Sequence, residues 1–116
     1  MKYKDYFLIA WIDITTHCNA GCPQCHRTNP KTLNKVDWLP LIQWSLDEFK
    51  IAFPKKSMDH ISEFQLCGTW GDPCMNKDIF EICEYIINNS DCHIIINTNG
   101  SMREPFWWTH LGYIIK

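Results

Sequence analysis

The sequence predicts an α/β protein built on a parallel β-sheet. Three short apolar segments, rich in β-branched and aromatic residues, alternate with segments whose apolar residues recur at helical spacing. Strands and helices that alternate in this way form right-handed βαβ units with parallel strands. The chain has 116 residues, which is enough for one domain with a modest core.

Residues 7–14 form a continuous apolar run, which suits a strand buried on both faces of a parallel sheet. The other two expected strands cover residues 61–66 and 93–96. Residues 113–115 are also apolar, and we expect them to begin a fourth strand.

Three helices are expected between and after these strands. Asp37 is placed to cap the first helix, because apolar side chains recur at intervals of three and four over residues 39–53, and Pro54 ends the pattern. Asn76 is placed to cap the second helix. Pro105 is expected at the first position of the third, where its missing N–H costs little.

A loop with polar residues or glycine follows each strand. These loops contain the cysteines of residues 18–25, the glycines of residues 68–73 and the turn at residues 97–100. The carboxyl ends of parallel strands lie on one edge of the sheet, which is where α/β folds place their binding sites. We therefore expect the three loops to form one site.

The first of these loops carries the spacing Cys18-x3-Cys22-x2-Cys25. Three thiolates on one short loop can hold three irons of a [4Fe–4S] cluster. No fourth cysteine follows at a matching spacing, so one iron would stay open for another ligand. A structural zinc site is closed and tetrahedral and would need a fourth protein ligand.

Other sites that these cysteines allow remain as alternatives. His17 or His26 would have to complete a zinc knuckle, although neither has the usual zinc-ligand separation. The pattern Cys22-x2-Cys25-His26 also fits covalent haem attachment, and the two cysteines alone fit a thioredoxin-like dithiol. Both of these leave Cys18 unexplained.

Composition restricts the setting and the partners. The net charge of −2 is dispersed, and no basic run indicates nucleic-acid binding. The seven cysteines are an odd number, and the first residues do not form a signal peptide, so we expect a reducing, cytoplasmic setting in which clustered cysteines bind metal. No segment has the length of about 20 apolar residues that a membrane span needs.

Together the motifs resemble those of the radical SAM (S-adenosylmethionine) superfamily. The cysteine spacing after the first strand looks like the family signature, Gly71-Asp72-Pro73 resembles its glycine-glycine-glutamate-proline motif, and Thr98-Asn99-Gly100 is similar to a turn often seen there. The matches come in family order and cover essentially the whole chain. The resemblance implies a partial (β/α) TIM-like barrel with about three βα units, in which residues 1–116 form the N-terminal portion of the radical SAM core domain.

The resemblance also implies a function and a set of site residues. Cys18, Cys22 and Cys25 would ligate a [4Fe–4S] cluster, and SAM would bind the open iron and be cleaved to a 5′-deoxyadenosyl radical that abstracts hydrogen from an unidentified substrate. The implied partners are a one-electron donor such as flavodoxin or ferredoxin, and a C-terminal half or partner chain. The implied SAM-binding residues are Gln24, Gly68, Gly71, Asp72, Pro73 and Asn97.

Two of these positions depart from the family pattern. Gln24 stands where an aromatic residue usually precedes the third cysteine, so we expect either its amide or His26 to contact SAM instead. Asp72 replaces the longer glutamate and is expected to accept a hydrogen bond from the SAM amine. The alternative function is a non-catalytic iron–sulfur or zinc-binding module that uses the same cysteines.

Overall fold

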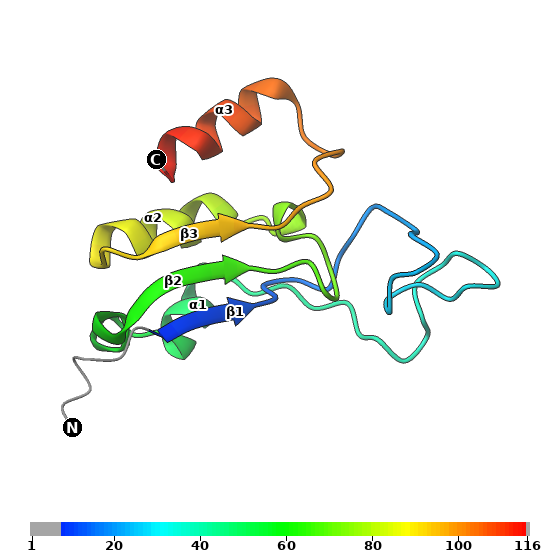
Figure 1. Ribbon diagram of the computed structural model, residues 1–116, viewed down its shortest axis with the longest axis horizontal. Coiled ribbons are helices and arrows are strands. Elements are labelled where there is room, and N and C mark those ends of the chain that lie inside the picture. The colour runs from blue at the N-terminus through cyan, green and yellow to red at the C-terminus, as the bar shows by residue number, and fades with distance from the viewer. Residues whose placement is uncertain (1–7, 116) are drawn as a thin grey trace.

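Three parallel strands with helices form the protein in the computed structural model, which describes residues 8–115. The strands β1 (Leu8–Ile12), β2 (Ile61–Leu66) and β3 (His93–Ile96) are adjacent in that order (Figure 1). The predicted α/β class with a parallel sheet is confirmed. The first strand ends at Ile12 rather than at residue 14, and Phe7 lies outside the described residues.

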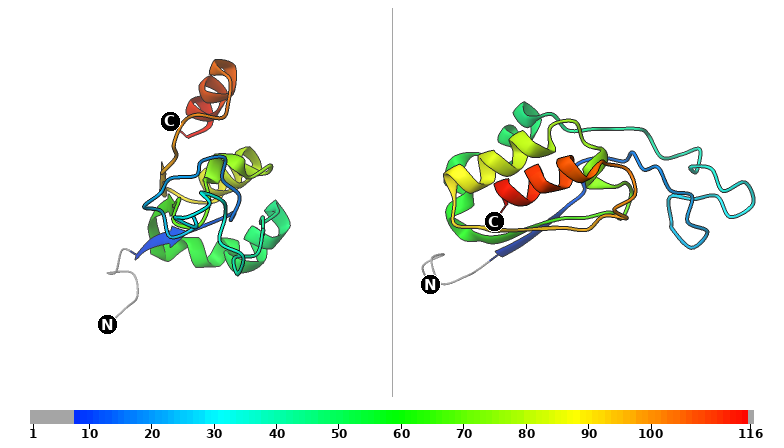
Figure 2. Two further views of the ribbon diagram at one scale, coloured as in Figure 1. Left: turned by 90° about the vertical axis from the view of Figure 1, so that its right-hand side faces the viewer. Right: turned by 90° about the horizontal axis from the view of Figure 1, so that it is seen from above.

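The two faces of the sheet differ in what covers them. The helices α1 (Leu46–Ala52) and α2 (Ile79–Asn89) lie on one face (Figure 2). Two rows of side chains in register pack toward them: Ala10, Phe64 and Ile94, then Ile12, Leu66 and Ile96. On the opposite face, Trp11 is 71% exposed and Ile95 is 41% exposed. The sheet therefore presents a bare face on the side away from these helices.

Aromatic rings join β2 to α1 in the core. Phe49 and Phe64 are fully buried, with their ring centroids 5.8 Å apart. From α2, Ile82, Cys83 and Ile86 are also fully buried, at the spacing that predicted a helix with one apolar face. Cys83 is therefore a core residue.

The helix α1 is much shorter than the sequence pattern predicted. It begins after Ser45, whose hydroxyl accepts a hydrogen bond from the first turn at 3.2 Å, and the predicted start at Asp37 is wrong. The intervening segment instead bonds to the chain that leaves β1, since the main-chain N–H of Thr16 donates to Ile42 at 2.9 Å. Its backbone groups are thus satisfied by a distant segment, although its apolar spacing suits a helix.

The helix α2 also starts later than predicted. Its N-cap position is Asp78, and Asn76 accepts a hydrogen bond from the main-chain N–H of Asp78 at 2.8 Å. The amide nitrogen of Asn76 donates to Ile14 at 2.8 Å and to Trp44 at 2.9 Å. Asn76 therefore ties three segments together, where a cap had been predicted.

The last helix, α3 (Pro105–Ile114), begins with proline at its first turn, as predicted. The expected fourth strand at residues 113–115 is wrong, because this segment forms the end of α3 and its cap. The Phe80 ring on α2 packs against Trp107 and His110, at centroid distances of 5.0 Å and 4.6 Å. These ring contacts pack α3 against α2.

Two short 3-10 helices complete the described elements: η2 (Lys55–His60) before β2 and η3 (Pro73–Met75) after it. Among residues 8–115, no helix is long and apolar enough to cross a membrane.

The core assignment predicts the effect of removing a single ring. Phe64→Ala should lower the free energy of unfolding by about 3–5 kcal/mol, the usual cost of emptying a buried aromatic site. Phe106→Ala is the matched control, because Phe106 is 79% exposed, and its effect should be small. Urea unfolding followed by circular dichroism measures both. Equal effects of the two substitutions would contradict this core.

Candidate functional site

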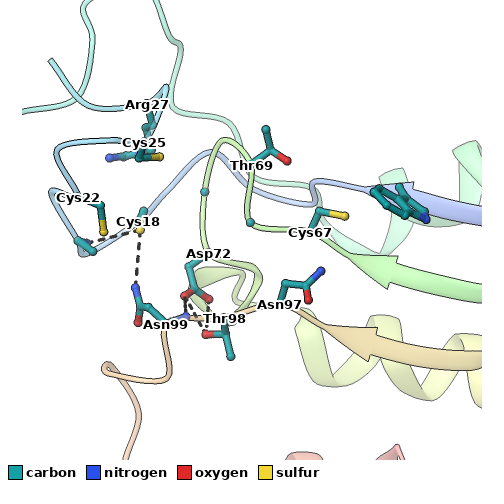
Figure 3. Close-up of a pocket in the computed structure, with 14 residues that line it drawn as sticks. Cys18, Cys22, Cys25, Arg27, Cys67, Thr69, Asp72, Asn97, Thr98 and Asn99 are labelled. Carbon is teal, nitrogen blue, oxygen red and sulfur yellow. Dashed lines mark hydrogen bonds between the residues drawn. The ribbon is translucent and has the colours of Figure 1, made fainter. Parts of the chain in front are cut away.

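A pocket of about 470 Å³ lies beyond the carboxyl ends of the three strands (Figure 3). All three loops singled out in the sequence contribute to it, so their predicted convergence is confirmed. The lining residues include Cys18, Cys22, Cys25, Arg27, Cys67, Gly68, Thr69, Gly71, Asp72, Asn97, Thr98 and Asn99.

The cysteine loop is closed at its base by hydrogen bonds to the segment before α1. The hydroxyl of Thr16 accepts from the main-chain N–H of Ile42 at 2.7 Å and donates to Pro40 at 2.6 Å. Arg27, which is 8% exposed, donates from Nε to the main-chain oxygen of Thr16 at 2.9 Å. The loop is therefore a fixed projection beyond the sheet (Figure 1).

The three thiols of this loop line one side of the pocket. A turn in which the main-chain N–H of Cys25 donates to Cys22 at 3.1 Å brings these two residues together, and the N–H of Ala20 donates to Cys18 Sγ at 3.5 Å. All three are free cysteines, with Cys22 exposed and the other two partly exposed. They are thus available as ligands.

Three thiols are the ligand type that an iron–sulfur cluster takes from a protein. Within residues 8–115, no three His, Cys, Asp or Glu side chains converge as ligands of one metal ion. Ligation of a cluster by Cys18, Cys22 and Cys25 therefore stays a prediction.

The glycine loop packs directly on the start of the cysteine loop. The main-chain N–H of Asp72 donates to His17 at 2.8 Å. A Cβ added at Gly71 would lie 2.7 Å from the main-chain oxygen of His17 and would also collide with that of Thr15. Only glycine permits this approach, so residue 71 is needed to join the two loops.

Asp72 joins the glycine loop to the turn after β3. Its side chain is 6% exposed and accepts from the Thr98 hydroxyl at 2.8 Å, from the Asn99 main-chain N–H at 2.9 Å and from the Cys74 main-chain N–H at 2.9 Å. These bonds occupy most of what a carboxylate can accept. Asp72 thus has a structural role, and its contact with a SAM amine stays a prediction.

The other predicted SAM-binding residues differ in their positions. Gly68 and Asn97 line the pocket. Pro73 is buried at the start of η3, and Gln24 is exposed and outside the lining residues. Contacts of Pro73 and Gln24 with SAM stay predictions.

Sequence reasoning missed Asp13, which follows β1 directly. Its carboxylate accepts a hydrogen bond from the main-chain N–H of Trp70 at 2.6 Å, which ties the first loop to the second. Burial raises the pKa of Asp13. Burial, with the negative charge of Asp13, also raises the pKa of the neighbouring Cys67 thiol. A charged residue directly after an apolar strand was the signal available in the sequence.

Two further cysteines are protected from deprotonation. Burial raises the pKa of Cys74 to about 11 and that of Cys83 to about 12. Both thiols are therefore protonated at neutral pH, which suits packing rather than ligation.

The sequence and the fold of the chain were compared with those of known proteins. No model of a known protein family matches the chain. The chain is 29% identical over 93 residues to a probable GTP 3',8-cyclase of Methanocaldococcus jannaschii, a match that covers 80% of this chain and 28% of that protein. The crystal structure of BtrN in complex with AdoMet and 2-DOIA superposes with a TM-score of 0.67 at 17% identity and covers 95% of this chain.

The chain has the fold of part of a radical SAM barrel. That it forms the N-terminal part stays a prediction. The predicted resemblance and the predicted partial barrel are therefore confirmed. The chain spans 28% of the length of the cyclase and 43% of that of BtrN, so it corresponds to less than half of either protein.

The close approach at Gly71 predicts a steric effect. Gly71→Ala should lower the free energy of unfolding by about 1–3 kcal/mol, because the added methyl group meets fixed backbone. Gly112→Ala is the matched control: nothing lies within 4 Å of its added Cβ, and alanine suits a helix better than glycine does. Urea unfolding compares the two. A wild-type value for Gly71→Ala would contradict the contact between the loops.

The buried thiols predict a pH dependence of stability. Cys83 loses its proton more readily in the unfolded chain, where its pKa is 9.0, than in the fold, where it is about 12. The free energy of unfolding should therefore fall as the pH rises above about 9. Cys83→Ala should make this fall shallower. Urea unfolding at a series of pH values measures it, and identical slopes for the two proteins would contradict the assignment.

Proposed function

We propose that the chain is the radical-generating part of a radical SAM enzyme. In this proposal Cys18, Cys22 and Cys25 hold a [4Fe–4S] cluster whose fourth iron is open to SAM. The main support is that the three thiols line the same pocket as the glycine loop and the turn after β3. A bound cluster supplies one-electron cleavage of SAM to methionine and a 5′-deoxyadenosyl radical, which takes a hydrogen atom from a substrate.

The residues of the chain contribute position and shape. Gly68 is exposed at the pocket, and its lack of a side chain lets a ligand approach the main chain. Asp72 fixes the loop through its three donors, so we propose that the loop meets SAM mainly through its peptide groups. Asn97, at the end of β3, supplies a further polar contact.

We also propose the partners that this chemistry requires. A small redox protein such as flavodoxin or ferredoxin delivers the electron at the cysteine loop, where Cys22 is exposed. Substrate contacts come from further βα units or from a partner chain, because this chain matches less than half of either relative. The bare face of the sheet, with Trp11, would then form part of the interior of the completed barrel.

Anaerobic reconstitution with iron and sulfide tests this function. The protein should bind a [4Fe–4S] cluster, and the electron paramagnetic resonance spectrum of the reduced form should change when SAM is added. Stoichiometric zinc binding without any effect of SAM would favour the non-catalytic module and contradict the proposed function.

The ligand assignment is tested separately. Replacement of Cys18, Cys22 or Cys25 with alanine should each abolish the cluster, because three irons each depend on one thiolate. Cys67→Ala is the matched control, since Cys67 lines the same pocket but lies outside the triplet, and it should retain the cluster. Iron content and visible absorbance measure both. A cluster that survives loss of a triplet cysteine would show that the assignment is wrong.

A further inference from the structure

A side-chain amide from the turn after β3 contacts one of the three cysteines. The Nδ2 atom of Asn99 donates to Cys18 Sγ at 3.8 Å (Figure 3). It also donates to Asn19 Oδ1 at 3.0 Å. Because the nitrogen has two hydrogens, it can make both bonds. Hydrogen bonds to cluster sulfurs are one means by which a protein sets a cluster's reduction potential.

The orientation of this amide is fixed by its other end. The Oδ1 atom of Asn99 accepts from the main-chain N–H of Ser101 at 2.9 Å and from the Ser101 hydroxyl at 2.7 Å. A main-chain N–H can only donate, so the oxygen must face Ser101 and the nitrogen must face the cysteine. The amide of Asn19 also donates to the Ser101 hydroxyl, at 3.0 Å, which closes the network.

The position of Asn99 depends on Asp72. The carboxylate of Asp72 accepts from the main-chain N–H of Asn99 at 2.9 Å and from the adjacent hydroxyl of Thr98 at 2.8 Å. The acid of the second loop thus holds the third loop in the place where its amide meets the first loop.

We propose that Asn99 raises the reduction potential of the cluster and that Asp72 is its positioning residue. This inference rests on the proposed function, since it concerns the cluster that Cys18 would ligate. The reduced cluster carries one more negative charge than the oxidised cluster. An N–H donor at a ligating sulfur therefore stabilises the reduced form more, and favours the state that donates an electron to SAM.

Potentiometric titration of the reconstituted protein, followed by visible absorbance, tests the inference. At a fixed applied potential, the ratio of reduced to oxidised cluster should be lower in Asn99→Ala by about three- to tenfold, the size of one ordinary hydrogen bond. Asn99→Asp keeps the shape of the side chain, removes the donor and adds negative charge, so its ratio should be lower still. Asn88→Ala is the control, because Asn88 is exposed on α2 away from the pocket, and should match the wild type.

A double-mutant cycle tests the role of Asp72. Asp72→Asn also removes a negative charge near the cluster, which by itself raises the ratio, so its effect is compared in the wild-type and Asn99→Ala backgrounds. If Asp72 positions Asn99, the ratio of Asp72→Asn relative to the wild type should be lower than the ratio of the double variant relative to Asn99→Ala. Additive effects would show that Asp72 acts independently of Asn99 and would overturn its positioning role.

The outcomes separate this inference from the function on which it rests. A wild-type protein that binds the cluster, with unchanged ratios in both Asn99 variants, would overturn the inference and leave the proposed function intact. A wild-type protein that binds no [4Fe–4S] cluster would overturn both. If Asn99→Ala does not fold, the ratio of reduced to oxidised cluster in Asn99→Asp alone tests the inference.

Discussion

The close contact between Gly71 and the chain that leaves β1 is the constraint on which the site depends. The main-chain N–H of Asp72 reaches His17 at 2.8 Å, and there is no room at Gly71 for a Cβ. This contact sets the glycine loop against the base of the cysteine loop. Asp72 is then in place to accept hydrogen bonds from Thr98 and Asn99, so that three strand ends become one wall of a pocket.

The parallel sheet makes this contact possible. Adjacent strands that run in one direction bring β1, β2 and β3 out at the same edge, and their register is fixed by apolar rows that pack under α1 and α2. The described core covers only one face of the sheet. The site is therefore formed by the loops and the bare face of the sheet. The stability of the fold comes mainly from the face that α1 and α2 cover.

The sequence predicted the features that depend on local pattern. The parallel sheet and the convergence of the three loops follow from apolar runs separated by helical periodicity. Prediction from local pattern was wrong where hydrogen bonds to distant segments determine the backbone conformation. Residues 37–44 have helical spacing, yet the hydrogen bond between Thr16 and Ile42 draws them away from a helix. The hydrogen bond from Asn99 to Cys18 joins residues far apart in sequence and leaves no periodic signal.

We propose that the three cysteines leave one iron of a cluster open to SAM. The Mössbauer spectrum of protein reconstituted with ⁵⁷Fe, recorded with and without SAM, tests this directly. We expect a [4Fe–4S] spectrum in which one iron site changes on addition of SAM while the other three do not. A spectrum that SAM leaves unchanged, or a protein that binds no cluster iron, would contradict it.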